Sequence, residues 1–251
     1  MRSRYPSASG FSYSFGPGPL TPAIKALVII NVAAFVIDWL VPGAFLQQTL
    51  GLYPRGVFRD LHVWQPVTYM FLHAGIAHIL FNMLALWMFG VELERMWGTR
   101  FFTKFYFVCG IGAAATTLLL SLMPGGFGRA LWNSVTIGAS GAIYGVLLAY
   151  GMYFPNRPIY MYLVFPIPAK YFVTIMGGIS LLLSIGGGGG GVAHTTHLGG
   201  LVVGYVYLKG MRIHVLSEIQ YRFLKWRINR MRRKFDVYSG GRADDVDRRV
   251  H

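Results

Sequence analysis

The sequence predicts an all-α, polytopic membrane protein, a bundle of six transmembrane helices. Three observations predict this class. Hydrophobic residues make up 54% of the 251 residues, and charged residues make up 13%, whereas a soluble domain carries about 25%. The apolar residues also fall into six separate runs. Backbone groups in lipid must be hydrogen-bonded within the chain, so we expect each run to be a helix.

The six apolar runs are separated by short polar breaks. They cover residues 24–41, 67–91, 102–123, 137–154, 171–185 and 192–208. The fifth and sixth are short for a full span, and the sequence Phe-Pro-Ile-Pro at 165–168 marks the entry to the fifth. The first 22 residues hold no apolar run, so we expect no signal peptide and a retained first span.

Basic residues flank the runs on alternate sides. One set of loops carries most of them: Arg2, Arg4, Lys25, Arg95, Arg100, Lys104, Arg157 and Lys170. The positive-inside rule therefore predicts cytoplasmic termini and six spans. We expect a flexible N-terminus over 1–22, a membrane domain over 23–210, and a tail over 211–251, part amphipathic helix and part disordered.

The tail holds about half of all the basic residues. From Lys209 onward there are 12 Lys and Arg but 5 Asp and Glu. Beside membrane spans such a tail indicates anionic lipid at the inner leaflet, and we expect no nucleic-acid partner. The loop at 186–191 is six glycines, which predicts either a plain flexible linker or a mobile loop that gates access. The single cysteine, Cys109, excludes an intrachain disulfide.

Several polar residues recur near the start of the second, fourth and sixth runs. Because these three runs cross in the same direction, their early residues share one depth in the outer half of the bilayer. Ionisable residues inside spans are costly and mark functional sites. The residues in question are His73, His78, Asn82, Ser140, His194 and His197.

Glycines four residues apart predict that the fourth and sixth runs pack closely. The pairs are Gly141 with Gly145 and Gly200 with Gly204, and such spacing lets helix backbones approach. Taken alone, each pair is also explained by ordinary small-residue packing. Together they predict that Ser140 comes within hydrogen-bond reach of an imidazole.

Serine and histidine at one depth favour nucleophilic catalysis. A serine hydroxyl needs a base, and histidine titrates near neutral pH. A tetrahedral oxyanion needs donors, which His78, Asn82 and the Ser140 backbone N–H would supply. Asn82 is explained equally well as an interhelical hydrogen-bond partner. No Asp or Glu shares this depth, and Asp38 has no evident partner, so we expect a Ser–His dyad.

Four motifs in this order resemble the signatures of the rhomboid proteases, over residues 24 to 208. They are Gly138-Ala139-Ser140-Gly141, His73-x4-His78-x3-Asn82, Glu94-x3-Gly98 and His197-x2-Gly200-x3-Gly204. The resemblance implies a six-helix rhomboid-like bundle whose active site lies in a water-filled cavity open to the outside. It also implies cleavage of transmembrane protein substrates in or near the bilayer.

The resemblance also assigns roles to single residues. Ser140 is the nucleophile, and His197 is the base because it has glycine three and seven residues later, whereas His194 does not. Tyr144 packs on the catalytic imidazole, and His78 and Asn82 face the oxyanion.

The remaining assignments are supporting ones. Gly138 and Gly141 flank the nucleophile, and we expect His194 to be structural or to support the catalytic imidazole from beside it. His73 orients the outer loop. Many family members have Trp-Arg where this chain has Trp64-Gln65, which bears on how the outer loop is anchored.

At the inner face we expect an ion-pair cluster of Glu94 with Arg95 and Arg100. A six-span core with a short tail predicts a bacterial inner membrane, with the active site toward the outer side. We expect no cofactor and no metal.

Two alternatives come from other function classes. The histidines His73, His78, His194 and His197 would also suit a nitrogen-rich metal site in a transporter, but that leaves Ser140 without a role. A catalytically inactive rhomboid-like protein that binds membrane clients is the second alternative. Such proteins typically lose the serine or the histidine, and both are present here.

Overall fold

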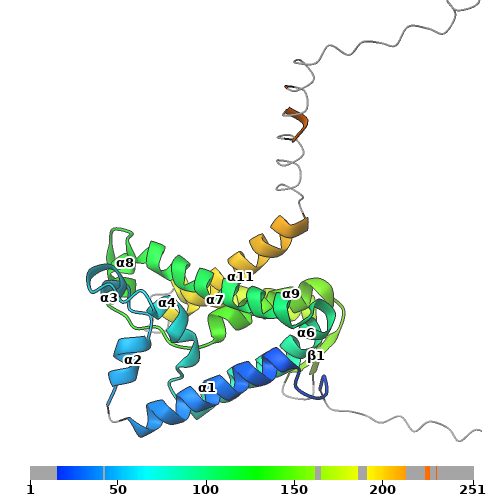
Figure 1. Ribbon diagram of the computed structural model, residues 1–251, viewed down its shortest axis with the longest axis horizontal. Coiled ribbons are helices and arrows are strands. Elements are labelled where there is room, and N and C mark those ends of the chain that lie inside the picture. The colour runs from blue at the N-terminus through cyan, green and yellow to red at the C-terminus, as the bar shows by residue number, and fades with distance from the viewer. Residues whose placement is uncertain are drawn as a thin grey trace, which may run out of the picture. The chain divides into compact units, whose positions relative to one another are not determined.

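The computed structural model describes residues 16–41, 43–161, 165–185, 191–212, 224–226 and 230. This part of the chain is mostly helical (Figure 1). The chain divides into two compact units, Met1–Leu208 and Lys209–His251. Residues 186–190 of the predicted glycine loop and nearly all of the basic tail lie outside the described residues, whereas Gly191 begins a helix.

Three helices are long and apolar enough to cross a membrane, among the residues described. The first is α1 (Pro22–Leu40) and the third is α7 (Thr99–Ser121). The second runs continuously over Ile76–Trp97. Its three parts are α5 (Ile76–Ala85), the π-helical segment η2 (Leu86–Gly90) and α6 (Val91–Trp97). The prediction of a helical membrane protein is therefore confirmed.

Three further helices lie where the last three apolar runs were expected. They are α9 (Ser140–Tyr153), α10 (Ala169–Ile185) and α11 (Gly191–Arg212). At about 1.5 Å per residue, the 14 residues of α9 extend about 21 Å. This helix is the centre of the fold: it packs along α7, and most of its residues are buried.

The predicted bounds of the second run were wrong at both ends. Residues at its start form α4 (Gln65–Thr68) and the 3-10 turn η1 (Tyr69–Phe71) instead. The chain is then extended at Leu72, and the long helix begins at Ile76. At the other end it continues through charged residues to Trp97, because hydropathy marks the apolar part of a helix but not its polar end.

Short helices lie at two opposite ends of the unit Met1–Leu208 (Figure 1). At one end lie α2 (Phe45–Leu50), α3 (Pro54–Arg59) and α8 (Gly126–Trp132), as Figure 1 shows. Phe58 stacks on Trp132 with ring centroids 5.8 Å apart, which joins α3 to α8. At the other end lie α6 and a β-hairpin that the sequence did not predict.

The hairpin consists of β1 (Pro158–Met161) and β2 (Phe165–Pro168), paired antiparallel. Ile159 lies opposite Ile167. Prolines cannot continue a helix, so these residues had been expected only to separate two helices. The hairpin is a local exception to the all-α class.

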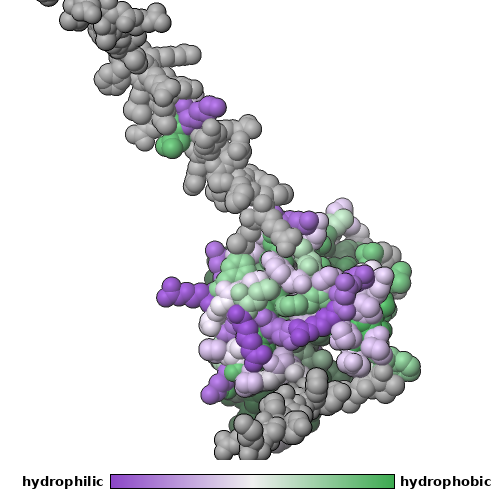
Figure 2. Space-filling view, turned by 90° about the vertical axis from the view of Figure 1, so that its right-hand side faces the viewer, coloured by the Kyte–Doolittle hydropathy of each residue, from purple (hydrophilic) through white to green (hydrophobic). Residues whose placement is uncertain are grey.

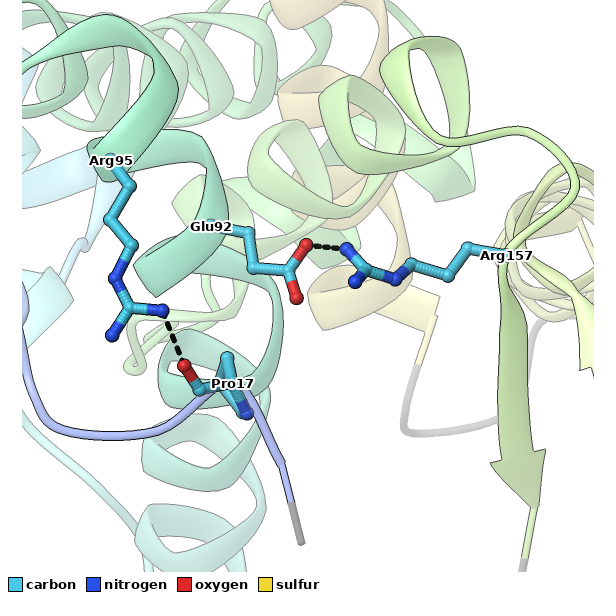
Figure 3. A network of polar contacts seen from close by, with 4 residues as sticks. All are labelled: Pro17, Glu92, Arg95 and Arg157. Carbon is cyan, nitrogen blue, oxygen red and sulfur yellow. Dashed lines mark hydrogen bonds and ion pairs between the residues drawn. The ribbon is translucent and has the colours of Figure 1, made fainter. Parts of the chain in front are cut away.

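Hydrophilic side chains gather on the face at the α6 and β1 end (Figure 2). The exposed basic residues beside these helix ends are Arg95, Arg100, Lys104, Arg157 and Lys170. Arg157 pairs with Glu92, and Arg95 donates to the carbonyl of Pro17 (Figure 3). These contacts tie α6 to the hairpin and to the segment that precedes α1.

Glu94 does not form the expected ion pair with Arg95 and Arg100. It is buried and accepts hydrogen bonds from the N–H groups of Ala23 (2.9 Å) and Ile24 (3.1 Å) in the first turn of α1. It also accepts from the hydroxyl of Thr99 (2.7 Å), at the start of α7. A carboxylate at a helix N-terminus satisfies unpaired N–H donors and complements the helix dipole. Glu94 therefore joins two helix N-termini.

Candidate active site

Ser140 is the first residue of α9. The loop that precedes it is held in place by backbone hydrogen bonds. Gly138 has φ +124°, a backbone conformation that residues other than glycine rarely adopt. Its N–H donates to the carbonyl of Tyr69 at 2.9 Å, and Thr136 pairs with Leu52 through two 2.9 Å backbone bonds. The backbone of this loop is therefore hydrogen-bonded although it forms no helix or strand. Backbone groups buried in a membrane protein need such partners.

The predicted close packing of α9 and α11 is confirmed. A Cβ added to Gly200 would lie 1.9 Å from the carbonyl oxygen of Gly141. A Cβ on Gly204 would lie 3.2 Å from the Cα of Gly145. Only glycine permits such a backbone approach, so these pairs set the distance between the two helices.

This packing brings Ser140 and His197 together. Ser140 Oγ lies 2.7 Å from His197 Nε2, a short hydrogen bond, and both side chains are half-buried. Tyr144, one turn after Ser140, stacks on the imidazole with ring centroids 4.3 Å apart and planes 8° apart. The stack and the hydrogen bond together keep Nε2 of His197 beside the hydroxyl of Ser140.

His197 rather than His194 faces the serine. The two imidazoles meet edge to face, with centroids 5.6 Å apart. Nδ1 of His197 is buried and has no hydrogen-bond partner among the described residues. No carboxylate therefore orients this ring within the described part of the chain.

His78 lies close to Gly138, two residues before the serine. Its Nδ1 accepts the backbone N–H of Ala74 at 3.3 Å, so a neutral ring carries its proton on Nε2. That nitrogen would be 2.8 Å from a Cβ built on Gly138. His78 therefore directs an N–H donor at the loop that ends in Ser140.

Asn82 and His73 are buried close to His78 in the chain. Asn82 is 6% exposed, and its side-chain Nδ2 has no partner in the described structure. Asn82 therefore retains an unused donor one turn beyond His78. His73 meets His78 edge to face, with centroids 5.0 Å apart, and both of its ring nitrogens are buried without a partner among the described residues.

The described side chains contain no group of three His, Cys, Asp or Glu residues arranged to hold a metal ion. Asp38, expected to lack a partner, accepts a hydrogen bond from Gln47 at 3.1 Å. It lies outside the Ser140 cluster.

Gln65 anchors the loop before the site, a role that sequence reasoning missed. It is fully buried, accepts the N–H of Tyr53 (3.0 Å) and donates to the carbonyl of Thr49 (3.2 Å). The neighbouring Trp64 donates to the same carbonyl at 2.9 Å. The position next to Trp64 was the available signal, since glutamine stands there in place of the arginine that the resemblance implies.

Thr196 was a second omission. Its hydroxyl lies 2.8 Å from that of Thr117 on α7, and both residues are buried. This contact fixes α11 against α7 one residue before His197. A polar residue buried within an apolar helix was the signal.

The chain is similar to known proteins of one family. The family model of the rhomboid domain matches residues 60–212. Rhomboid protein 1, mitochondrial, of Saccharomyces cerevisiae is 31% identical over 73% of this chain and 51% of its own length. Rhomboid protease GluP of Bacillus subtilis is 32% identical over 57% of this chain and 25% of its own. Rhomboid protease GlpG of Yersinia enterocolitica is 25% identical over 74% and 60%.

The chain spans about half the length of the curated relatives that match it over most of its residues. Relatives named as mitochondrial and relatives from bacteria match at similar identity. The matches therefore do not single out the bacterial inner membrane that the sequence predicted.

Proposed function

The chain belongs to the rhomboid family of integral membrane proteins, and from this we propose that it is an intramembrane serine endopeptidase. Its substrates are transmembrane proteins, cut in or near their membrane-spanning helices. The observation that carries the proposal is the 2.7 Å contact between Ser140 Oγ and His197 Nε2. A dyad at this distance is poised for proton transfer.

The proposed reaction proceeds through an acyl-enzyme. His197 Nε2 takes the proton of Ser140 as Oγ attacks the scissile carbonyl carbon. The protonated imidazole then gives this proton to the leaving amine nitrogen as the peptide C–N bond breaks. Water attacks the Ser140 ester with His197 again as base, which releases the acid and restores the hydroxyl.

Three donors stabilise the oxyanion in this proposal. They are Nε2–H of His78, Nδ2–H of Asn82 and the backbone N–H of Ser140. The unpartnered Nδ2 of Asn82 and the Nε2 tautomer of His78 support these roles. Removal of one such donor typically costs about 100- to 1,000-fold in kcat.

The length of α9 supports an active site within the bilayer. The hydrocarbon core is about 30 Å thick, and α9 is about 9 Å shorter. The C-terminal end of α9 lies next to the charged face of Arg157, so the Ser140 end stops inside the membrane.

By the positive-inside rule that charged face is cytoplasmic. The proposal therefore includes six spans, cytoplasmic termini and a site toward the outer side of a bacterial inner membrane. Anionic lipid would bind at the basic tail.

Other residues support the dyad in this proposal. Tyr144 stacks on the imidazole of His197 and fixes its plane. Gly138 lets the loop lie close to His78, and Gly141 lets α9 lie close to α11. His73 packs against His78, and His194 packs against His197 without touching substrate. The presence of both dyad residues in hydrogen-bond contact favours the protease over an inactive client-binding protein. A metal transporter would leave Ser140 without a role.

The test is cleavage of a membrane-protein substrate in proteoliposomes. Purified protein is reconstituted with a panel of single-span substrates, and cleavage is measured by gel and mass spectrometry. We expect cleavage near the substrate helix by the wild type, none by Ser140→Ala or His197→Ala, and no effect of a zinc chelator. Cleavage retained by Ser140→Ala would refute the nucleophile. Substrate binding without cleavage by wild type would favour the client-binding alternative.

A further inference from the structure

Ser180 carries a buried hydroxyl on a helix that is otherwise largely exposed. Most of the apolar side chains of α10, such as Ile175, Ile179 and Leu182, face outward. Ser180 is 0% exposed and donates to the hydroxyl oxygen of Tyr144 at 3.2 Å. Within the described residues this is the only side-chain hydrogen bond from α10 to another helix.

This hydrogen bond is unusual for a serine in a membrane helix. Such serines usually bond to a carbonyl of their own preceding turn. Ser184, one turn later, does so, since its hydroxyl donates to the carbonyl of Ser180 at 2.8 Å. The Ser180 hydroxyl instead reaches α9. Both serines are buried, so burial alone does not explain the difference.

Tyr144 is the group that holds the imidazole of His197. In a nucleophile–base pair the base is normally oriented by a third group. Here Nδ1 of His197 has no partner in the described structure, so no hydrogen bond on that side fixes the ring. Besides Ser140, the ring is in contact with Tyr144, whose plane is 8° from its own, and with His194, which meets it edge to face. Of these contacts the parallel stack on Tyr144 covers the face of the ring.

We infer that Ser180 is a positioning residue, whose hydroxyl holds Tyr144 so that the imidazole of His197 stays directed at Ser140. This inference rests on the proposed protease function, because it assigns Ser180 a part in that reaction. It also links α10 to the dyad. A shift of α10 that breaks the Ser180–Tyr144 hydrogen bond loosens the base without any change in α9 or α11.

The experiment is a double-mutant cycle on the full chain in proteoliposomes. The variants are Ser180→Ala, Tyr144→Phe and their combination, with Ser184→Ala as the matched control. Each is measured for kcat and KM on a cleaved single-span substrate, for the rate of Ser140 labelling by a fluorophosphonate, and for thermal stability.

We expect Ser180→Ala to lower kcat and the labelling rate about fivefold, with KM unchanged. This is the effect of one hydrogen bond worth about 1 kcal/mol. Tyr144→Phe keeps the ring but loses the same bond, so it should match Ser180→Ala. The double variant should be no slower than the slower single variant. Ser184→Ala should have the wild-type kcat.

Three outcomes overturn the inference. They are a wild-type kcat for Ser180→Ala, independent losses that multiply in the double variant, and an equal loss for Ser184→Ala. Failure of the proposed function gives a different result, in which wild type and Ser140→Ala show the same cleavage and labelling. An active wild type and an inactive Ser140→Ala beside a normal Ser180→Ala would reject the positioning role alone.

Discussion

Substitution of Gly200 by alanine tests the geometry of the dyad at a distance. The added Cβ would lie 1.9 Å from the carbonyl oxygen of Gly141, where ordinary contact begins at 3.4 Å. The atom in contact is backbone and cannot rotate away as a side chain can. We therefore expect α11 to move away from α9 by about 1.5 Å, the difference between 3.4 Å and 1.9 Å. His197 lies one turn before Gly200 and moves with it.

A displacement of this size exceeds the tolerance of a catalytic pair. Misplacement by about 1 Å costs about 100-fold in rate, and overpacking destabilises by about 1–3 kcal/mol. We therefore expect Gly200→Ala to lower kcat/KM about 100-fold in the proteoliposome assay. Thermal unfolding and size-exclusion chromatography verify that the variant remains folded.

A graded series of glycines supplies the controls. Gly204→Ala places its Cβ 3.2 Å from the Cα of Gly145, so its effect should be much smaller. Gly210 lies on the same helix with nothing within 4 Å of an added Cβ, so Gly210→Ala should be fully active. Wild-type kcat/KM for Gly200→Ala would refute the claim that this crossing sets the Ser140–His197 distance.

Three further substitutions have distinct expected results. In Gly138→Ala the alanine must adopt a φ of +124°, and its Cβ lies 2.8 Å from His78 Nε2. We therefore expect kcat to fall at least about 100-fold. A normal kcat would contradict the placement of His78. His194→Ala should retain most of its labelling by a fluorophosphonate, whereas His197→Ala should lose all; equal loss would reverse their assignments. Glu94→Gln should lower the free energy of unfolding by about 1.5–3 kcal/mol in a denaturant titration, because the charge that caps two helices is lost. Unchanged stability would contradict the capping role.

The relation of α9 to α11 was predictable from sequence because it depends on residue type at fixed spacing. Glycines four apart mark a close crossing, and Gly141 and Gly200 do meet. The choice of His197 over His194 came from the family motif, and the structure brings His197 to Ser140. These features depend on local sequence, so a single chain reveals them.

Features that depend on partners distant in sequence were not predictable. Glu94 accepts from Ala23, 71 residues away, so nothing nearby in the sequence distinguishes capping from an ion pair. Gln65 anchors backbone 12 to 17 residues upstream, which requires the loop to be folded. The hairpin at 158–168 depends on pairing of two short strands, which hydropathy does not register.

The bounds of the second helix failed for a related reason. Hydropathy predicted a start at residue 67, but Tyr69 belongs to a 3-10 turn, and its carbonyl accepts the N–H of Gly138. An apolar segment near an active site is not necessarily helical, because another segment of the protein can supply hydrogen-bond partners for its backbone N–H and C=O groups.

The most direct test of the Ser140–His197 dyad is the site of fluorophosphonate attachment. Full-length protein in liposomes is treated with the probe, digested, and analysed by peptide mass spectrometry. We expect one adduct, on Ser140, which is absent after His197→Ala and retained after Ser184→Ala. An adduct on another serine, or undiminished labelling of Ser140 in His197→Ala, would contradict it.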